Sequence, residues 1–201
     1  NMKEVSSNYT KIDEIPFDFS RRCLSIILKD NNDKVQLITK GAVEEILNIC
    51  TMVDYRGTVS PLTKEIRQNI LKISKGLNKD GLRVVAVCQK NVSPDIQKFE
   101  VSDEKDMILL GFIGFLDPPK ESAKESINRL HYYGIKVIVL TGDNAEVTKA
   151  VCDKVGIKCK KIILGSQLDN LDDFAVLRLL KKHNVFAKLS PIQKARIVRL
   201  L

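Results

Sequence analysis

The sequence predicts an α/β protein in two parts, and three features of the chain support this. Two apolar segments separated by the turn cluster Lys29–Asp33 are a hairpin signal. Helical patterns follow them, so the first part has the α+β pattern of antiparallel strands and packed helices. From about Met107, strands alternate with helices, which is typical of a parallel sheet. The polar stretch Ser102–Asp106 separates the parts and gives expected domains of 1–103 and 104–201.

Each element of the first part follows from a local pattern. Ile, Leu and Val fill the two hairpin strands, and apolar residues then recur at helical spacing. Gly81 ends the second helix. In order, the expected elements are strands 22–28 and 34–39, helices 41–50 and 63–78, and strand 82–89.

In the second part, turn and cap residues set the bounds. Asp117-Pro118-Pro119 is a stiff corner after a strand, and Gly134 suits the left-handed end of a helix. Ser190 and Pro191 are a cap and a first-turn proline. The expected order is strand 108–115, helix 121–133, strand 136–140, helix 145–155, strand 162–165, helix 172–183, strand 184–189 and helix 191–201, which together predict a doubly wound parallel sheet.

Composition limits the classes of function. The longest apolar run, 107–116, is too short to cross a bilayer, and the polar first residues are unlike a secretory signal. The five cysteines form no Cys-x-x-Cys pair and favour a reducing, cytosolic setting. The two histidines lack a second ligand at useful spacing, so no metal site is expected. The net charge of +8 favours an anionic partner, but no arginine-rich block with aromatics indicates nucleic acid.

The segment Lys136-Val-Ile-Val-Leu-Thr-Gly-Asp-Asn144 is the most informative one. An apolar strand there ends at Thr141, Gly142 and Asp143, the edge where open α/β sheets bind ligands. Asn144 caps the next helix, whose amino end favours an anion, so the arrangement suits phosphate. The alternative is a strand-to-helix turn with a good cap. Lys194, in the first turn of the last helix, either serves a bound anion or faces solvent.

The chain resembles the cytoplasmic nucleotide-binding and phosphorylation domains of the P-type ATPases. The resemblance spans nearly the whole chain, and the order and spacing of its motifs carry it. They are Lys40-Gly41-Ala42, Asp117-Pro118-Pro119-Lys120, Thr141-Gly142-Asp143 and Ala187-Lys-Leu-Ser-Pro-Ile-Gln-Lys194. Three further blocks, 11–19, 81–87 and 115–120, are most similar to the bacterial magnesium-transporting branch.

The resemblance implies ATP as the ligand of the first domain. It assigns Phe17 to stacking on adenine, and Lys40 with Gly41 to the nucleotide pocket. It assigns Arg83, a forked donor, to the phosphates, and Asp117 to the hinge between the domains. Without the resemblance, Phe17 would instead be a core residue of a strand, and Phe19 could be confused with it.

For the second domain, the resemblance implies a partial haloacid dehalogenase-like phosphoryl-transfer site. Thr141 and the Gly142 N–H hold the phosphoryl group, Asp143 supports the pocket, and Lys194 neutralises the phosphoryl oxygens. The ligands of the required Mg²⁺ are expected mostly outside this chain. At Lys188 the family often has arginine, and lysine loses the bidentate fork.

Two family motifs are absent from the sequence: Asp-Lys-Thr-Gly-Thr, which carries the phosphorylated aspartate, and Gly-Asp-Gly-x-Asn-Asp. We therefore expect a fragment cut on both sides, part of the cytoplasmic region of a bacterial integral membrane pump, with no ATPase turnover of its own. Its expected partners are the actuator and transmembrane domains of the same pump. The missing aspartate-bearing strand would leave strand 136–140 at an open edge, which predicts a dimer or a covering helix.

Two other functions compete with a cation pump. A free-standing haloacid dehalogenase-like phosphatase would share the Thr-Gly-Asp and lysine motifs, but the sequence has no Asp-x-Asp-x-Thr nucleophile pattern. A non-catalytic binding module would leave Phe17, Lys40 and Arg83 without a joint role.

Overall fold

A computed structural model describes residues 7–96 and 98–201. Contacts divide the chain into two compact units. The first unit comprises Asn1–Ser74 and Val84–Gly114, and the second comprises Lys75–Arg83 and Phe115–Leu201. Each unit has its own sheet and its own buried core, so the two are described separately.

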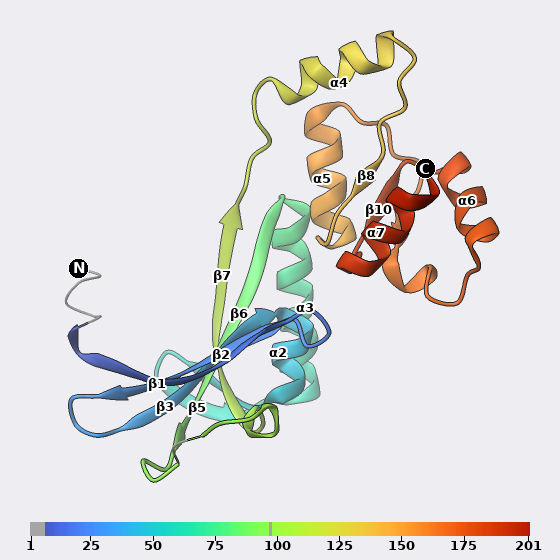
Figure 1. Cartoon of the computed structure of the whole chain (residues 1–201). Coiled ribbons are helices and arrows are strands. Elements are labelled where there is room, and N and C mark those ends of the chain that lie inside the picture. Colours follow the sequence, from blue (N-terminus) through green and yellow to red (C-terminus); the bar gives the residue numbers. More distant parts are fainter. Residues whose placement is uncertain (1–6, 97) are drawn as a thin grey trace. The chain divides into compact units, whose positions relative to one another are not determined.

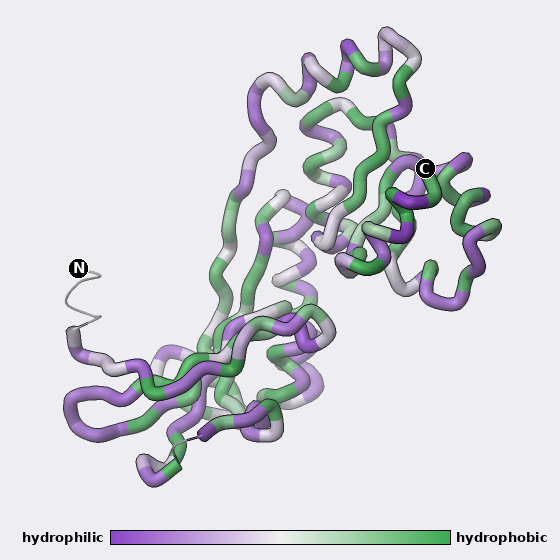
Figure 2. Tube along the Cα trace, in the orientation of Figure 1, coloured by the Kyte–Doolittle hydropathy of each residue, from purple (hydrophilic) through white to green (hydrophobic). Residues whose placement is uncertain are grey.

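The first unit is built on a seven-stranded, mostly antiparallel sheet (Figure 1). Its strands are β1 (Tyr9–Asp18), β2 (Cys23–Asp30), β3 (Val35–Ala42), β4 (Cys50–Tyr55), β5 (Thr58–Pro61), β6 (Leu82–Val92) and β7 (Met107–Leu116), in the order β1-β2-β3-β6-β7-β4-β5. The predicted hairpin is confirmed as β2 and β3, whose antiparallel register runs from Cys23 opposite Gly41 to Lys29 opposite Val35. Figure 2 shows its turn as a hydrophilic segment.

Two helices are inserted between strands of this sheet, as the helical patterns predicted. Helix α2 (Val43–Ile49) lies between β3 and β4 in the sequence, and α3 (Lys64–Lys79) lies between β5 and β6. The core lies between sheet and helices because alternate strand residues and one helix face are apolar. Ile27, Leu37, Ile46, Leu47 and Met107 are all fully buried there. A short 3-10 helix, η1 (Val101–Asp103), precedes β7.

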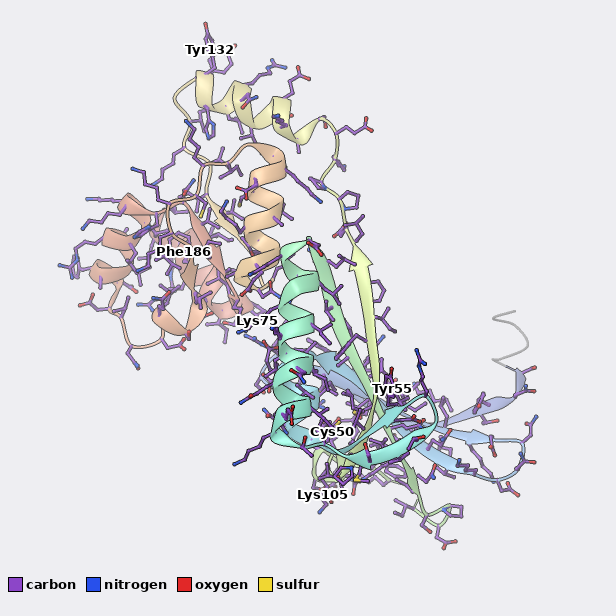
Figure 3. The ribbon with its side chains drawn as sticks, turned by 180° about the vertical axis from the view of Figure 1, so that it is seen from behind. Cys50, Tyr55, Lys75, Lys105, Tyr132 and Phe186 are labelled. Carbon is purple, nitrogen blue, oxygen red and sulfur yellow. The ribbon has the colours of Figure 1, made fainter. Side chains whose placement is uncertain are left out.

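The second unit contains a three-stranded parallel sheet of β8 (Val139–Leu140), β9 (Ile163–Leu164) and β10 (Val185–Ala187), in the order β8-β10-β9. Its helices are α4 (Ala123–Tyr132), α5 (Ala145–Val155), α6 (Asp173–Lys182) and α7 (Pro191–Leu200), and η2 (Gly165–Gln167) follows β9. Asn144 and Ser190 cap α5 and α7 as predicted, by accepting hydrogen bonds from the N–H groups of Val147 and Gln193. Phe186 is fully buried at the centre of this sheet (Figure 3).

The structure corrects three details of the sequence prediction. Strand 108–115 was expected to begin the parallel sheet of the second part, but β7 pairs in parallel with β4 in the sheet of the first unit. Strand 136–140 is reduced to Val139–Leu140. Strands β1, β4 and β5 were not anticipated. For β4 and β5 the reason is that Arg56-Gly57 is a weak turn signal between short segments. The unit boundary consequently falls at Gly114, later than the polar stretch 102–106.

None of the described helices combines the length and the apolar character that a bilayer crossing requires.

Candidate phosphate-binding and nucleotide-binding residues

The loop after β8 is held by its own side chains. Thr141 Oγ1 donates to Asp143 Oδ2 at 2.9 Å, and the Asp143 N–H donates back to Thr141 Oγ1 at 3.1 Å. Because both groups are half-buried, this pair fixes the loop against the start of α5. The Gly142 position is open, since an added Cβ would meet only the Leu189 carbonyl, at 3.6 Å. The loop therefore leaves space for a ligand to approach its backbone.

The same loop is bonded to the segment that leads into α7. The Lys188 N–H donates to the Asp143 carbonyl at 2.7 Å, and the Leu189 N–H donates to the Thr141 carbonyl at 3.0 Å. Lys194 follows in the first turns of α7, half-buried, with no ion-pair partner in the described part of the chain. The structure thus puts Thr141, Asp143 and the start of the Lys194 helix at one edge of the parallel sheet.

Gln193 is a residue of this edge that the sequence did not single out. Its amide oxygen accepts from the Ser190 N–H at 2.8 Å, and its amide nitrogen donates to the Gly165 carbonyl at 2.9 Å and to Asp169 at 2.6 Å. It therefore ties the loops after β9 and β10 together. The capping pattern Ser190-x-x-Gln193 was the available signal.

Arg83 lies in the second unit and has two carboxylate partners there. Its Nη2 donates to Asp143 Oδ2 at 2.9 Å, and its Nη1 is 3.1 Å from Asp117 Oδ2. About half of the Arg83 side chain is exposed, so the two ion pairs are weak and replaceable. Hence an incoming phosphate would compete with Asp117 and Asp143 for the guanidinium.

A cavity of about 260 Å³ opens beside these residues. Arg83, Asp117, Thr141 and Asp143 form its polar part. The rest of the wall is mostly apolar and comes from the Asp117 corner, β8 and α5: Pro118, Pro119, Val139, Thr148, Val151, Cys152, Val155 and Ile157. The cavity therefore has a polar part and an apolar groove, and the groove includes Val139 of the edge strand β8.

In the first unit, strand register places Lys40 on the less buried face of the sheet. Lys40 lies directly opposite Leu24 on β2 and Val87 on β6, so the three side chains share one face. Lys40 is exposed and its two neighbours are half-buried. Phe17, near the end of β1, is half exposed and contacts Phe19 edge-on, with ring centroids 5.1 Å apart. Phe17 is thus not a core residue.

Gly41 has a structural reason to be glycine. A Cβ there would lie 2.6 Å from both the Arg22 carbonyl oxygen and the Cys23 Cβ. Glycine at this position lets β2 and β3 approach each other closely beside Lys40.

The described residues contain no group of three or more His, Cys, Asp or Glu side chains suited to a metal ion. The carboxylates of Asp117 and Asp143 are engaged by Arg83, so these residues do not form a Mg²⁺ site as they stand.

Comparisons with known proteins identify the family of the chain. The family model described as "P-type ATPase, cytoplasmic domain N" matches residues 1–122. The chain is 41% identical, over 99% of its length, to the magnesium-transporting ATPase, P-type 1, of Escherichia coli K12. It is 38% identical over 98% to a protein of the same name from Salmonella typhimurium LT2, and 29% identical over 97% to a calcium-transporting ATPase of Bacillus subtilis. It spans 22% of the length of each of these relatives.

Proposed function

The chain belongs to the P-type ATPase family, and on this premise we propose that it is the ATP-binding and partial phosphoryl-binding region of a cation pump. The first unit is the nucleotide-binding domain, and the second unit is part of a haloacid dehalogenase-like phosphorylation domain. The parent protein hydrolyses ATP to move a cation across a bacterial membrane, with this region on the cytoplasmic side. Mg²⁺ is the transported ion by similarity to the magnesium-transporting relatives.

The observation that carries the proposal is the position of Phe17 and Lys40 on one open end of the antiparallel sheet. An exposed ring offers a flat apolar surface to adenine, and Lys40 offers a cation between the half-buried Leu24 and Val87. These residues fit a purine with an attached anion. Gly41 supports the site by the close packing of β2 and β3 beside it.

In the second unit, the residues at the carboxyl edge of the parallel sheet suit a phosphoryl group. The Thr141 hydroxyl and the Gly142 N–H would hold its oxygens, and Lys194 would neutralise their charge. Asp143 orients Thr141 by their mutual hydrogen bonds and, with Asp117, restrains Arg83 until a phosphate competes for it. Bound Mg²⁺ would supply charge neutralisation between phosphate oxygens, and most of its ligands belong to other parts of the pump.

The apolar groove beside β8 supports the expectation that a further strand packs there in the parent protein. β8 is an edge strand, and Val139, Val151 and Val155 line the groove next to it. The phosphorylated aspartate would arrive on that strand. Because the sequence contains no Asp-Lys-Thr-Gly-Thr motif, we expect the 201-residue chain to bind ATP without hydrolysing it. Hydrolysis that follows the chain through purification would refute this part of the proposal.

Titration of the ¹⁵N-labelled chain with ATP tests the proposal. Phe17→Ala should weaken binding by roughly 5- to 150-fold, the equivalent of ~1–3 kcal/mol for one stacked base. Tyr55→Ala is the matched control, because Tyr55 is an aromatic of the same unit with a larger exposed fraction, 68%. Chemical-shift changes should gather around Lys40 and Gly41. Equal affinities for the two variants, or no saturable shifts, would favour a binding module for another partner.

A further inference from the structure

The second unit has a concentrated positive surface that the proposed ATP and phosphoryl sites do not use. A pocket of about 320 Å³ is lined by the five lysines Lys136, Lys158, Lys160, Lys181 and Lys182. His131, His183, Val137 and Asn184 complete its lining, which includes no carboxylate. Its volume lies in the range of sites for small ligands.

The pocket owes its place to the polarity of the parallel strands. Lys136 and Val137 precede β8, Lys160 precedes β9, and Asn184 immediately precedes β10. The three strands run in the same direction, so these residues gather at the amino edge of the sheet. The loop with Thr141 follows β8 and lies at the carboxyl edge. The pocket is therefore separate from the phosphoryl-binding edge.

Hydrogen bonds give the pocket fixed walls. Lys136 Nζ donates to the carbonyls of Leu180 and Lys181 at 2.5 and 3.3 Å, so it balances the negative carboxyl end of α6. Asn184 Nδ2 donates to the Lys158 carbonyl at 3.1 Å and holds that loop beside the start of β10. The walls thus keep the other lysines close together although their charges repel.

Four lysines remain to serve a ligand. Lys158, Lys160, Lys181 and Lys182 are exposed, and none has an ion pair within the described residues. Other lysines of the chain have such pairs, for example Lys149 with Asp153. A cluster of unneutralised cations in a concave site favours a multiply charged anion.

Two exposed aromatic residues are next to the pocket residue His131 in the sequence. Tyr132 and Tyr133 follow His131 directly, are 85% and 69% exposed, and contact each other edge-on at 5.4 Å. Figure 3 shows Tyr132 pointing away from the unit at the end of α4. Tyrosine beside lysines is the combination found where proteins meet lipid headgroups.

We propose that this lysine pocket, defined by Lys158, Lys160, Lys181 and Lys182, binds a phosphate group carried by a second ligand other than the ATP of the proposed function. The ligand is either the headgroup of an anionic phospholipid or a soluble phosphate compound. Both present the same oxygens to the four ammonium groups. The exposed Tyr132 and Tyr133, which follow His131 in the sequence, favour the headgroup.

Two probes and two variants test the proposal on the full 201-residue chain. Pyrophosphate titrated into the ¹⁵N-labelled chain stands for a soluble phosphate, and flotation with phosphatidylglycerol vesicles, against phosphatidylcholine vesicles, stands for a lipid. The pocket variant is Lys158→Glu with Lys181→Glu. The control is Lys154→Glu with Lys161→Glu, which changes the net charge equally at exposed lysines outside the pocket. Circular dichroism verifies that both variants fold.

We expect the pocket variant to lose roughly tenfold or more in affinity, since each reversal replaces an attraction by a repulsion, while the control keeps most of it. Saturable shifts with pyrophosphate alone identify a soluble ligand, and variant-sensitive flotation with phosphatidylglycerol identifies a headgroup. Equal losses in both variants would reduce the effect to net charge and overturn the proposal. So would shifts that spare Lys158, Lys160 and Asn184, or tighter pocket-dependent binding of a short duplex DNA. Phe17→Ala should leave these results unchanged, so a failure of the ATP proposal can be distinguished from a failure of the lysine-pocket proposal.

Discussion

The buried ion pair between Arg21 and Glu104 provides the sharpest stability test in the first unit. Glu104 is 6% exposed, and Arg21 Nη1 lies 2.5 and 2.6 Å from its two carboxylate oxygens. Ser25 Oγ donates to Glu104 Oε1 and also pairs with Thr39 Oγ1 at 2.8 Å. Burial acts to lower the pKa of Arg21, but contact with Glu104 raises it overall, so the guanidinium stays charged.

Replacing one partner leaves the other charge buried and unpaired. Glu104→Ala and Arg21→Ala should therefore each lower the free energy of unfolding of this unit by about 3–5 kcal/mol. Changing both residues to methionine removes both charges and should cost far less than the sum of the single changes. The exposed pair of Lys11 and Glu14 is the control, and Glu14→Ala should cost at most ~1 kcal/mol.

Urea unfolding measures these differences. With a slope near ~2 kcal/mol per M, a loss of 3–5 kcal/mol lowers the midpoint by about 1.5–2.5 M. The two units can unfold separately, so hydrogen exchange of peptides from β2 and β3 should be followed beside peptides from α6 and α7. The reasoning fails if Glu104→Ala costs no more than Glu14→Ala, or if the double change costs the sum of the single ones.

Four further outcomes are expected. Gly41→Ala should destabilise the first unit by ~1–3 kcal/mol through the 2.6 Å contacts of its Cβ. Gly76→Ala, whose Cβ meets nothing within 4 Å, should instead stabilise helix α3 by ~0.5–1 kcal/mol, and thermal unfolding measures both changes. Hydrogen bonds from the N–H groups of Phe99 and Glu14 lower the pKa of Asp13 from its ordinary value of 3.8. The stability that Asp13 contributes is therefore present above pH 3.8 and is lost as the pH falls below that value. Hydrogen-exchange protection of the Phe99 amide should show this loss, and Asp13→Asn should weaken its pH dependence. Alkylation at pH 8, followed by peptide mass mapping, should label the half-buried Cys159 before the four buried cysteines. Among these four, burial raises the pKa of the Cys152 thiol to about 11. Earlier labelling of a buried thiol would contradict the burial of these cysteines in the core. Sedimentation should detect a concentration-dependent dimer through the edge strand β8, or else a monomer. In the monomer, hydrogen exchange should find the β8 amides protected by a covering helix. A monomer with freely exchanging β8 amides would contradict both expectations.

Local signals in the sequence were sufficient for most elements and for their capping residues. Helix α5 begins and ends where the pattern predicted, at Ala145 and Val155, because Asn144 caps its amino end and Gly156 ends it in the left-handed conformation. The hairpin of β2 and β3 followed in the same way from its polar turn. Such elements depend on residues close in sequence, so one sequence suffices to predict them.

Sheet membership was less predictable, because it depends on pairing between distant segments. The apolar run of β7 fits any buried strand, and its place between β6 and β4, with Met107 opposite Cys50, assigns it to the first unit. The partner of Arg21 was equally hidden, since Glu104 lies 83 residues away and looks like an ordinary charged residue of a polar stretch. Resemblance singled out Thr141 and Lys194 as candidates, but the ion pairs of Arg83 with Asp117 and Asp143 join residues that are distant in sequence and no local pattern predicts them.

The parallel sheet of the second unit explains how the two proposed anion sites fit on one small unit. Strands that run in one direction collect different residues at their two edges: the hydroxyl and glycine of the Thr141 loop at the carboxyl edge, and lysines at the amino edge. The residues that line the two sites are different, and salt in the solvent screens the interaction between exposed charges that lie far apart. Reversing Lys158 and Lys181 should therefore change phosphate binding at the amino edge and leave the ion pairs of Arg83 unchanged.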